Sequence, residues 1–266
     1  MSKYKNVIER VFLNNYKKSA IKVSFNRDEL AQACDELGIP RIKNLGDIPY
    51  SYRFRKDLPD LIKEVCPANS EWIIIGTGIG TYEFRLAAPG KIEPTPNRQR
   101  IKVPDATPEI VRKYAPGTDE QALLTKIRYN RLIDLFTGLT CYSIQNHLRT
   151  TIQNIGQIEI DEVYLGLNKK GTHFIIPCQA KSPGDKFGIV QVIQDIEFCK
   201  SRYQNAICKP IALQFLNEND VAILELVVEE INGIFNFSVV DERHYKLVGR
   251  DEISDEEIRA MSLLEK

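Results

Sequence analysis

The 266-residue sequence predicts a mixed α/β protein, and three features support this class. Segments with helical periodicity alternate with β-rich runs along most of the chain. Residues 156–181 carry two such runs around the polar turn Asn168-Lys169-Lys170-Gly171, which predicts a β-hairpin. A proline-rich stretch at 89–108 divides the elements into two groups. We therefore predict one domain at 1–88, a linker at 89–108 and a second domain at 109–266.

The first domain is predicted to contain three short helices followed by a β-hairpin, which is the order of a winged-helix module. Val7, Val11 and Phe12 share one face of the first helix, and Asn26 can cap the second. The glycine run 76–80 precedes a strand and not a helix N-terminus, so we interpret it as a hairpin tip and not as a phosphate-binding loop. The predicted helices are 3–18, 27–37 and 58–65, and the predicted strands are 21–25, 72–75 and 81–86.

Basic and aromatic residues alternate in the segment between the second and third helices, residues 40–56. Basic groups can neutralise DNA phosphates, and aromatic rings can pack on sugars or bases. The alternative is a loop whose tyrosines pack on the domain and whose arginines are solvated. The candidate DNA-binding residues are Arg41, Lys43, Tyr50, Tyr52, Arg53 and Arg55.

The second domain is predicted to alternate helices and strands around the 156–181 hairpin. Leu123, Ile127 and Leu135 are expected on the inner face of a long helix. His147 falls on a predicted helix, where we expect a surface position or a supporting hydrogen bond. Ser254 is expected to cap the last helix. The predicted helices are 108–114, 119–136, 142–150 and 186–203, and the further strands are 210–216, 221–228 and 235–240.

The hairpin places chemically useful side chains on its two strands. Glu159 and Asp161 share one face of the first strand, and Gln179 and Lys181 share one face of the second. Antiparallel pairing can gather these four side chains into a site for a divalent metal and a phosphate. A solvated hairpin with ordinary surface charges is the alternative.

The apolar positions of the first hairpin strand change parity along the strand. They are even at Ile158 and Ile160 but odd at Val163 and Leu165. Because the strand period is two, this change predicts a bulge or bend at Asp161-Glu162, and bulges often re-aim side chains beside active sites.

Composition limits the function classes. Lysine plus arginine and aspartate plus glutamate each total 36, so the zero net charge excludes the strongly basic signature of a protein that coats nucleic acid, but it permits a DNA enzyme with a basic groove. The six cysteines lack CxxC spacing, which favours buried free thiols in a reducing cytoplasm over zinc ligands or disulfides. The sequence shows no signal peptide and no membrane-length apolar run, so we expect a soluble, cytoplasmic protein with no membrane partner.

The predicted order helix, strand, strand, helix, strand over residues 119–216 resembles the PD-(D/E)xK nuclease superfamily. Asp161 on the first hairpin strand and Gln179-Ala180-Lys181 on the second carry the resemblance. The chain is most similar to type II restriction endonucleases, some of which fuse a winged-helix domain to the nuclease core. The resemblance covers the central hundred residues, and it implies a restriction-endonuclease-like core with a central mixed sheet flanked by helices.

The resemblance also implies roles for individual residues. Asp161 would be a metal ligand, Ala180 would offer its carbonyl as another, and Lys181 would orient the attacking water and stabilise charge on the phosphate. Gln179 stands where an acid is usual and would bind the metal or position the water. Glu159 ranks first, and Glu162 second, as the carboxylate that replaces the missing acid. Gln191 resembles a glutamine found in some branches, Mg²⁺ is the implied metal, and Mn²⁺ can substitute for it.

The sequence therefore predicts a Mg²⁺-dependent endonuclease that cuts double-stranded DNA. A type II restriction enzyme acts on a palindrome through two symmetry-related sites, so we expect a homodimer. One alternative is a winged-helix transcriptional regulator with a non-catalytic C-terminal dimerisation domain. Another is a repair or junction nuclease with the same core.

Overall fold

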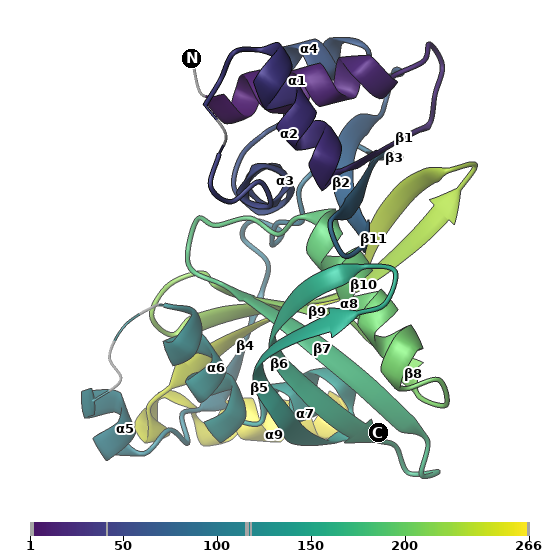
Figure 1. The fold of residues 1–266 in the computed structure, drawn as a ribbon. Coiled ribbons are helices and arrows are strands. Elements are labelled where there is room, and N and C mark those ends of the chain that lie inside the picture. Colours follow the sequence, from purple (N-terminus) through teal and green to yellow (C-terminus); the bar gives the residue numbers. More distant parts are fainter. Residues whose placement is uncertain (1–2, 41, 115–116, 118, 265–266) are drawn as a thin grey trace.

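A large mixed β-sheet flanked by helices runs through the whole molecule in this computed structural model, which describes residues 3–40, 42–114, 117 and 119–264 (Figure 1). The chain is therefore of the α/β class that the sequence predicts. Its N-terminal helices lie at one end of the sheet, at the top of Figure 1, and the later helices flank the strands below them.

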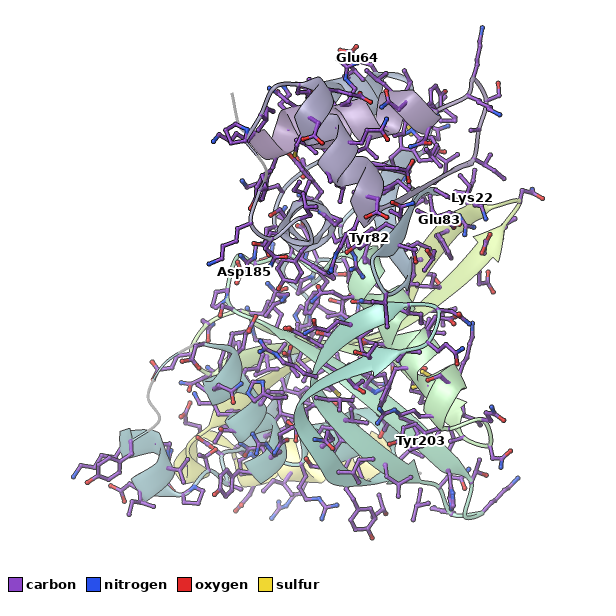
Figure 2. All side chains as sticks on the ribbon, viewed as in Figure 1. Lys22, Glu64, Tyr82, Glu83, Asp185 and Tyr203 are labelled. Carbon is purple, nitrogen blue, oxygen red and sulfur yellow. The ribbon has the colours of Figure 1, made fainter. Side chains whose placement is uncertain are left out.

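The N-terminal unit packs its helices on three antiparallel strands. Phe12 of the first helix contacts Trp72 and Phe84 of the strands with ring centroids 5.5 and 5.0 Å apart. Figure 2 shows Lys22 and Glu83 side by side on neighbouring strands, where their ion pair spans 3.0 Å. The elements are α1 (Lys3–Asn15), β1 (Lys22–Asn26), α2 (Arg27–Glu36), α3 (Asp47–Phe54), α4 (Asp60–Glu64), β2 (Glu71–Gly78) and β3 (Thr81–Ala87).

Most N-terminal elements agree with the sequence prediction, and the cap of α2 is confirmed in detail. The Asn26 side chain accepts the amide hydrogens of Asp28 and Glu29, and the Glu29 carboxylate accepts the Asn26 amide hydrogen. This reciprocal capping box fixes the start of the helix. Helix α3 forms inside the basic and aromatic segment 40–56, where the sequence pattern predicts no helix.

The remaining elements build the larger part of the sheet and its covering helices. Two helical segments, α6 and α7, pack on one face of the central strands, and α8 packs on the other. The elements are β4 (Arg100–Pro104), α5 (Glu109–Tyr114), α6 (Glu120–Tyr129), α7 (Leu132–Thr137), β5 (Thr140–Ile152), β6 (Gly156–Leu167), β7 (His173–Lys181), α8 (Ile189–Arg202), β8 (Ile207–Cys208), β9 (Ile211–Phe215), β10 (Asp220–Ile231), β11 (Ile234–Val248), the 3₁₀ turn η1 (Arg250–Glu252) and α9 (Asp255–Leu264).

The strand order across the described part of the sheet is β1-β3-β11-β10-β9-β7-β6-β5. Strands β5, β6 and β7 are consecutive antiparallel neighbours, and α8 then carries the chain to β9, which pairs in parallel with β7. A short parallel pairing of β3 with β11 attaches the N-terminal unit to the same sheet. The proline-rich stretch 89–108 contributes β4, which pairs in parallel with β11.

Two predictions for the second half of the chain are wrong. Residues 142–150 form the edge strand β5 and not a helix, because they pair antiparallel with β6, and His147 therefore lies exposed on a strand. The predicted helix 119–136 is two helices, since Arg131 has a left-handed backbone (φ 50°) between α6 and α7. The break changes the helical phase, so Leu135, expected inside, is 55% exposed.

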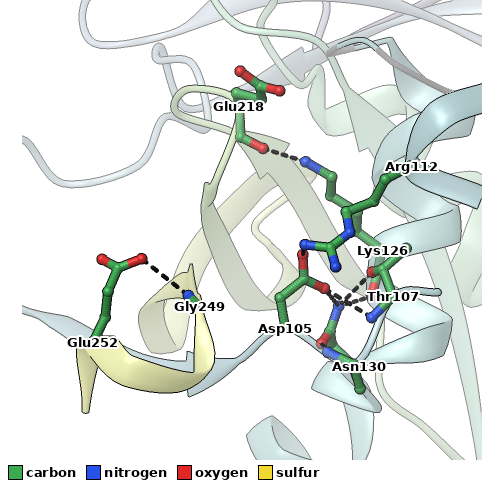
Figure 3. Close-up of polar contacts among 9 residues, drawn as sticks. Asp105, Thr107, Arg112, Lys126, Asn130, Glu218, Gly249 and Glu252 are labelled. Carbon is green, nitrogen blue, oxygen red and sulfur yellow. Dashed lines mark hydrogen bonds and ion pairs between the residues drawn. The ribbon is translucent and has the colours of Figure 1, made fainter. Parts of the chain in front are cut away.

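The break after α6 is stabilised by a buried asparagine (Figure 3). The Asn130 side chain donates to Thr107 Oγ1 at 3.1 Å and to Asp105 Oδ1 at 3.2 Å, and it accepts the Ala106 amide hydrogen at 2.7 Å. Burial alone would raise the pKa of Asp105, but the hydrogen bonds from Thr107 and Asn130 and the charge of Arg112 lower it below its ordinary value. This network attaches the segment after β4 to the end of α6.

Three smaller predictions are confirmed, which concern β9, the cap of α9 and the free cysteines. Strand β9 is buried at every position, and Ser254 caps α9 by accepting the Glu257 amide hydrogen at 3.2 Å. All six cysteines are free; Cys66 and Cys208 are half-buried and the others are buried. In the described part of the chain, no helix combines the length and the apolar character that crossing a membrane requires.

Gly76 lies at a close approach of the N-terminal unit to the rest of the molecule. A Cβ atom added there would lie 2.0 Å from the Ile155 carbonyl oxygen in the turn between β5 and β6. We expect Gly76→Ala to lower the free energy of unfolding by about 3 kcal/mol, because backbone must move to accommodate the methyl group. Urea unfolding measures this, and Gly188→Ala is the control, since a Cβ there meets nothing within 4 Å and only the helix cap weakens, by at most about 1 kcal/mol. Equal losses in both variants would contradict the close contact.

Candidate active site

Strands β6 and β7 separate beside Asp161. Their pairing runs from Leu167 opposite His173 to Glu162 opposite Cys178 and stops there, while β7 continues in pairing with β9 as far as Lys181. Past that point the Ala180 amide donates a hydrogen bond to Asp161 Oδ2 at 2.8 Å. The carboxylate therefore satisfies a backbone group that the diverging strands leave unpaired.

The predicted change of face on β6 is present at this point. Ile158, Ile160 and Val163 all pack in one cluster with Phe198 of α8, so two residues separate Ile160 from Val163 where strict alternation allows one. The accompanying register shift lies on the neighbouring strand, between Ser143 and Gln145 of β5. This shift lies opposite Val163 and Tyr164, directly beyond the change of face on β6, so both strands are irregular in this region.

Asp161, Lys181 and Glu120 form a cluster that we call the acid–lysine cluster. Lys181 Nζ lies 3.3 Å from Glu120 Oε1. The pKa of Asp161 lies above its ordinary value, mainly because the carboxyl is buried and secondly because the Glu120 charge is close. The hydrogen bond from the Ala180 amide and the charges of Lys181 and His147 act in the opposite direction. The cluster thus combines a largely buried carboxyl, a second carboxylate and an ammonium group.

Glu120 was not identified in the sequence analysis. It is the first residue of α6, and Asp119 caps this helix by accepting the Ala122 amide hydrogen at 2.8 Å. The apolar face of α6, including Leu123 and Ile127, packs in the same cluster as Ala180, which holds the start of the helix beside the end of β7. The only sequence signal for Glu120 is its position beside Asp119 at the start of a predicted helix. Acidic residues at a helix start are common because they interact favourably with the helix dipole, so this signal does not indicate a functional site.

The structure places Gln179 in a different set of contacts, on the α8 side of the sheet. Its side-chain nitrogen donates to Asp195 Oδ1 at 2.9 Å and to the Glu159 carbonyl at 3.2 Å, and its oxygen accepts from Gln191 at 3.5 Å. Asp195, also missed in the sequence analysis, is buried, and burial raises its pKa well above the ordinary value. Gln179 and Gln191 are therefore brought together, with an amide orientation set by Asp195.

The two other acidic candidates on β6 are engaged with arginines. Glu159 is partly exposed and pairs with Arg149 on β5 at 3.2 Å. Glu162 is completely buried, accepts a hydrogen bond from Ser143 at 2.6 Å and lies 3.4 Å from Arg128 Nε. The second carboxylate of the acid–lysine cluster is therefore Glu120 of α6, and neither Glu159 nor Glu162 of β6.

No family model, curated protein or solved structure matches the chain.

The chemistry of the cluster fits a hard divalent cation. Asp161 and Glu120 supply carboxylate oxygens, and Mg²⁺ is typically held by one or two carboxylates together with waters and substrate phosphate. Among the described residues no three Asp, Glu, His or Cys side chains gather into a metal-binding group. Two carboxylates with a neighbouring ammonium nevertheless suit a cation that shares its coordination with a phosphate. Ala180 is placed at the same point through its amide hydrogen bond to Asp161.

The candidate DNA-binding residues that the structure describes lie before, on and directly after α3. Lys43 and Arg55 are exposed, and the Arg55 guanidinium lies 5.0 Å from the Tyr50 ring centroid. Tyr52 packs against the N-terminal core, as the alternative interpretation of this segment predicts, and Arg53 is largely buried. Arg41 lies outside the described residues.

Proposed function

We propose that this chain is a Mg²⁺-dependent endodeoxyribonuclease of the PD-(D/E)xK type that cuts double-stranded DNA as a homodimeric type II restriction enzyme. The observation that carries the proposal lies where β6 and β7 diverge: Asp161 accepts the Ala180 amide hydrogen, and Lys181, the next residue, lies 3.3 Å from Glu120 and acts electrostatically on Asp161. The proposal includes a restriction-endonuclease-like core and a winged-helix-like N-terminal domain.

The topology around the site supports this proposal. Three consecutive antiparallel strands, β5, β6 and β7, are followed by the crossover helix α8 and the parallel strand β9. The cluster lies at the end of β7, with α6 on one side. A phosphodiester approaching this end of the strands would meet carboxylates and an ammonium group together.

Each residue of the cluster has a chemical role in this proposal. Asp161 and Glu120 would hold Mg²⁺, which when bound supplies Lewis acidity and lowers the pKa of a coordinated water. The Lys181 ammonium, held by Glu120, would stabilise the negative charge that builds on the phosphate in the transition state. The contacts of Gln179 with Gln191 and Asp195 would fix the end of β7, which carries Lys181.

Duplex cleavage adds two requirements outside the cluster. Cutting both strands at a palindrome needs two sites related by symmetry, which is the reason for proposing a homodimer. Exposed cations of the N-terminal unit, including Lys43 and Arg55, would contact the phosphate backbone.

Incubation of supercoiled plasmid with the wild-type protein tests the proposal. We expect linear or discretely fragmented DNA with Mg²⁺ or Mn²⁺ and intact plasmid with EDTA. Random nicking would favour a repair or junction nuclease with the same core. Duplex binding without cleavage in either metal would overturn the proposal in favour of a DNA-binding regulator.

Glu120→Gln is expected to lower the cleavage rate about a hundred-fold, because it removes a carboxylate that holds both the metal and Lys181 while preserving side-chain volume. Gel-based cleavage rates and duplex affinity measured on the same preparation check this. Glu109→Gln is the matched control, since Glu109 is an exposed acid in the first turn of α5. This substitution should leave the cleavage rate unchanged. Wild-type rates in Glu120→Gln would remove this residue from the site.

A further inference from the structure

A pocket of about 270 Å³ lies between the N-terminal unit and α8, separate from the acid–lysine cluster. Strands β2 and β3 form one wall and α8 forms another, and the turn between β5 and β6 and the ends of β10 and β11 complete it. The walls are apolar at Ile75, Val190, Ile193 and Phe235. Its size is at the small end of the range usual for ligand pockets, roughly 300–1,000 Å³.

Arg53 of α3 lines this pocket with a guanidinium group that has unused donors. Its Nε and Nη2 atoms are buried and have no hydrogen-bond partner among the residues that the structure describes. The guanidinium carbon lies 4.8 Å from the Phe54 ring centroid, a contact that leaves the in-plane N–H donors free. A buried donor without a partner costs on the order of 1–3 kcal/mol, more for a charged group.

The other cations that line the pocket have carboxylate partners. Arg85 pairs with Glu83 at 3.6 Å and with Glu230, and Lys200 pairs with Glu197 at 2.7 Å. No carboxylate of the described residues pairs with Arg53. Burial lowers the pKa of its guanidinium to about 10, so the group remains cationic at neutral pH. Arg53 is thus a buried cation without a carboxylate partner among the described residues, in a cavity whose three lining carboxylates, Glu83, Glu197 and Glu230, pair with its other cations.

We propose that this pocket binds a small oxyanion, a carboxylate or a phosphate monoester, carried on an aromatic or apolar body, with Arg53 as its counter-ion. A guanidinium offers a planar pair of donors that matches either oxyanion. The apolar side chains of α8 and β11 receive the body of the ligand. Burial of two of the guanidinium nitrogens and the small volume favour such a molecule over the backbone of a DNA duplex.

Calorimetric titration of the full-length protein without divalent metal tests this site with phenyl phosphate, benzoate and phenol. We expect wild type to bind at least one of the two anions and not phenol, which lacks the charge. Arg53→Gln should weaken that binding at least ten-fold, on the scale of a charged hydrogen bond. Arg55→Gln, an exposed neighbour outside the pocket lining, should change it less than two-fold.

Circular dichroism checks that Arg53→Gln is folded, and Arg53→Lys provides a second variant that keeps the charge but loses the paired donors. Binding by Arg53→Lys should be intermediate. Failure of both anions to bind wild type at millimolar concentration, or equal binding by Arg53→Gln, would overturn the proposal. So would a loss of duplex affinity in Arg53→Gln without any small-anion binding, because Arg53 would then be a DNA contact. The Lys181→Ala variant should bind the anion normally, so this site and the nuclease proposal can fail independently.

Discussion

Lys181→Ala is expected to lower DNA cleavage by about a thousand-fold while duplex affinity stays within a few-fold of wild type. The ammonium group lies beside Glu120 and acts electrostatically on Asp161, where it can stabilise charge that develops only in the transition state. Removing one such preorganised group typically costs about 10²–10³ in rate. Single-turnover cleavage of an end-labelled duplex, with affinity measured in Ca²⁺ or EDTA, separates the two effects.

Lys186→Ala is the matched control for this substitution. Lys186 lies five residues further along the chain, is half exposed and forms an ion pair with Glu93, a residue distant in sequence. Its loss should leave cleavage within about two-fold of wild type, since exposed ion pairs contribute little. Comparable losses in the two variants would indicate a general effect of positive charge near the substrate, and undiminished cleavage by Lys181→Ala would remove the lysine from the chemistry.

Asp161→Asn is expected to abolish cleavage and, in the absence of metal, to stabilise the fold. Burial raises the pKa of Asp161, so the charged form is disfavoured in the folded protein. The asparagine oxygen can still accept the Ala180 hydrogen bond, which makes the removal of charge the main change. We expect the free energy of unfolding at pH 7 to rise by about 1 kcal/mol, which is the usual size of a single stabilising substitution.

The sign of this effect sets its pH dependence. A carboxyl whose pKa is raised on folding binds its proton more tightly in the native state, so wild type loses stability as pH rises from the unfolded pKa through the folded one. Below the unfolded pKa both states are protonated, and the advantage of Asp161→Asn should disappear. Urea unfolding at pH 3 and pH 7 measures this, with the exposed Asp185→Asn as a neutral control. Equal stability of Asp161→Asn and wild type at pH 7 would contradict the claim that the buried Asp161 charge destabilises the fold. Retained cleavage by Asp161→Asn would contradict its role in the reaction.

The sequence predicted the part of the site that depends on local patterning. Period-two alternation, a polar turn and a change of parity locate the hairpin and its bend at Asp161, and the structure contains both. These signals are local because neighbouring side chains on a strand are determined by the backbone itself. The same reasoning identified the Asn26 cap.

The contacts that sequence reasoning missed join residues far apart in the chain. Glu120 and Lys181 are separated by 61 positions, and only the packing of α6 on the sheet brings them together. The amide of Gln179 is directed to Asp195 by the docking of α8, which periodicity does not specify. Strand β5 was taken for a helix because its run of exposed polar residues resembles a helix face when the partner strand is unknown.

Digestion of a sequenced phage genome by the wild-type protein, followed by mapping of the DNA ends, tests the central claim most directly. The proposed site predicts Mg²⁺-dependent fragments whose ends fall at one recurring sequence, and no such fragments from a Lys181→Ala preparation purified in parallel. Intact phage DNA in both Mg²⁺ and Mn²⁺, under conditions where the protein binds the duplex, would contradict the assignment of the acid–lysine cluster as a nuclease site.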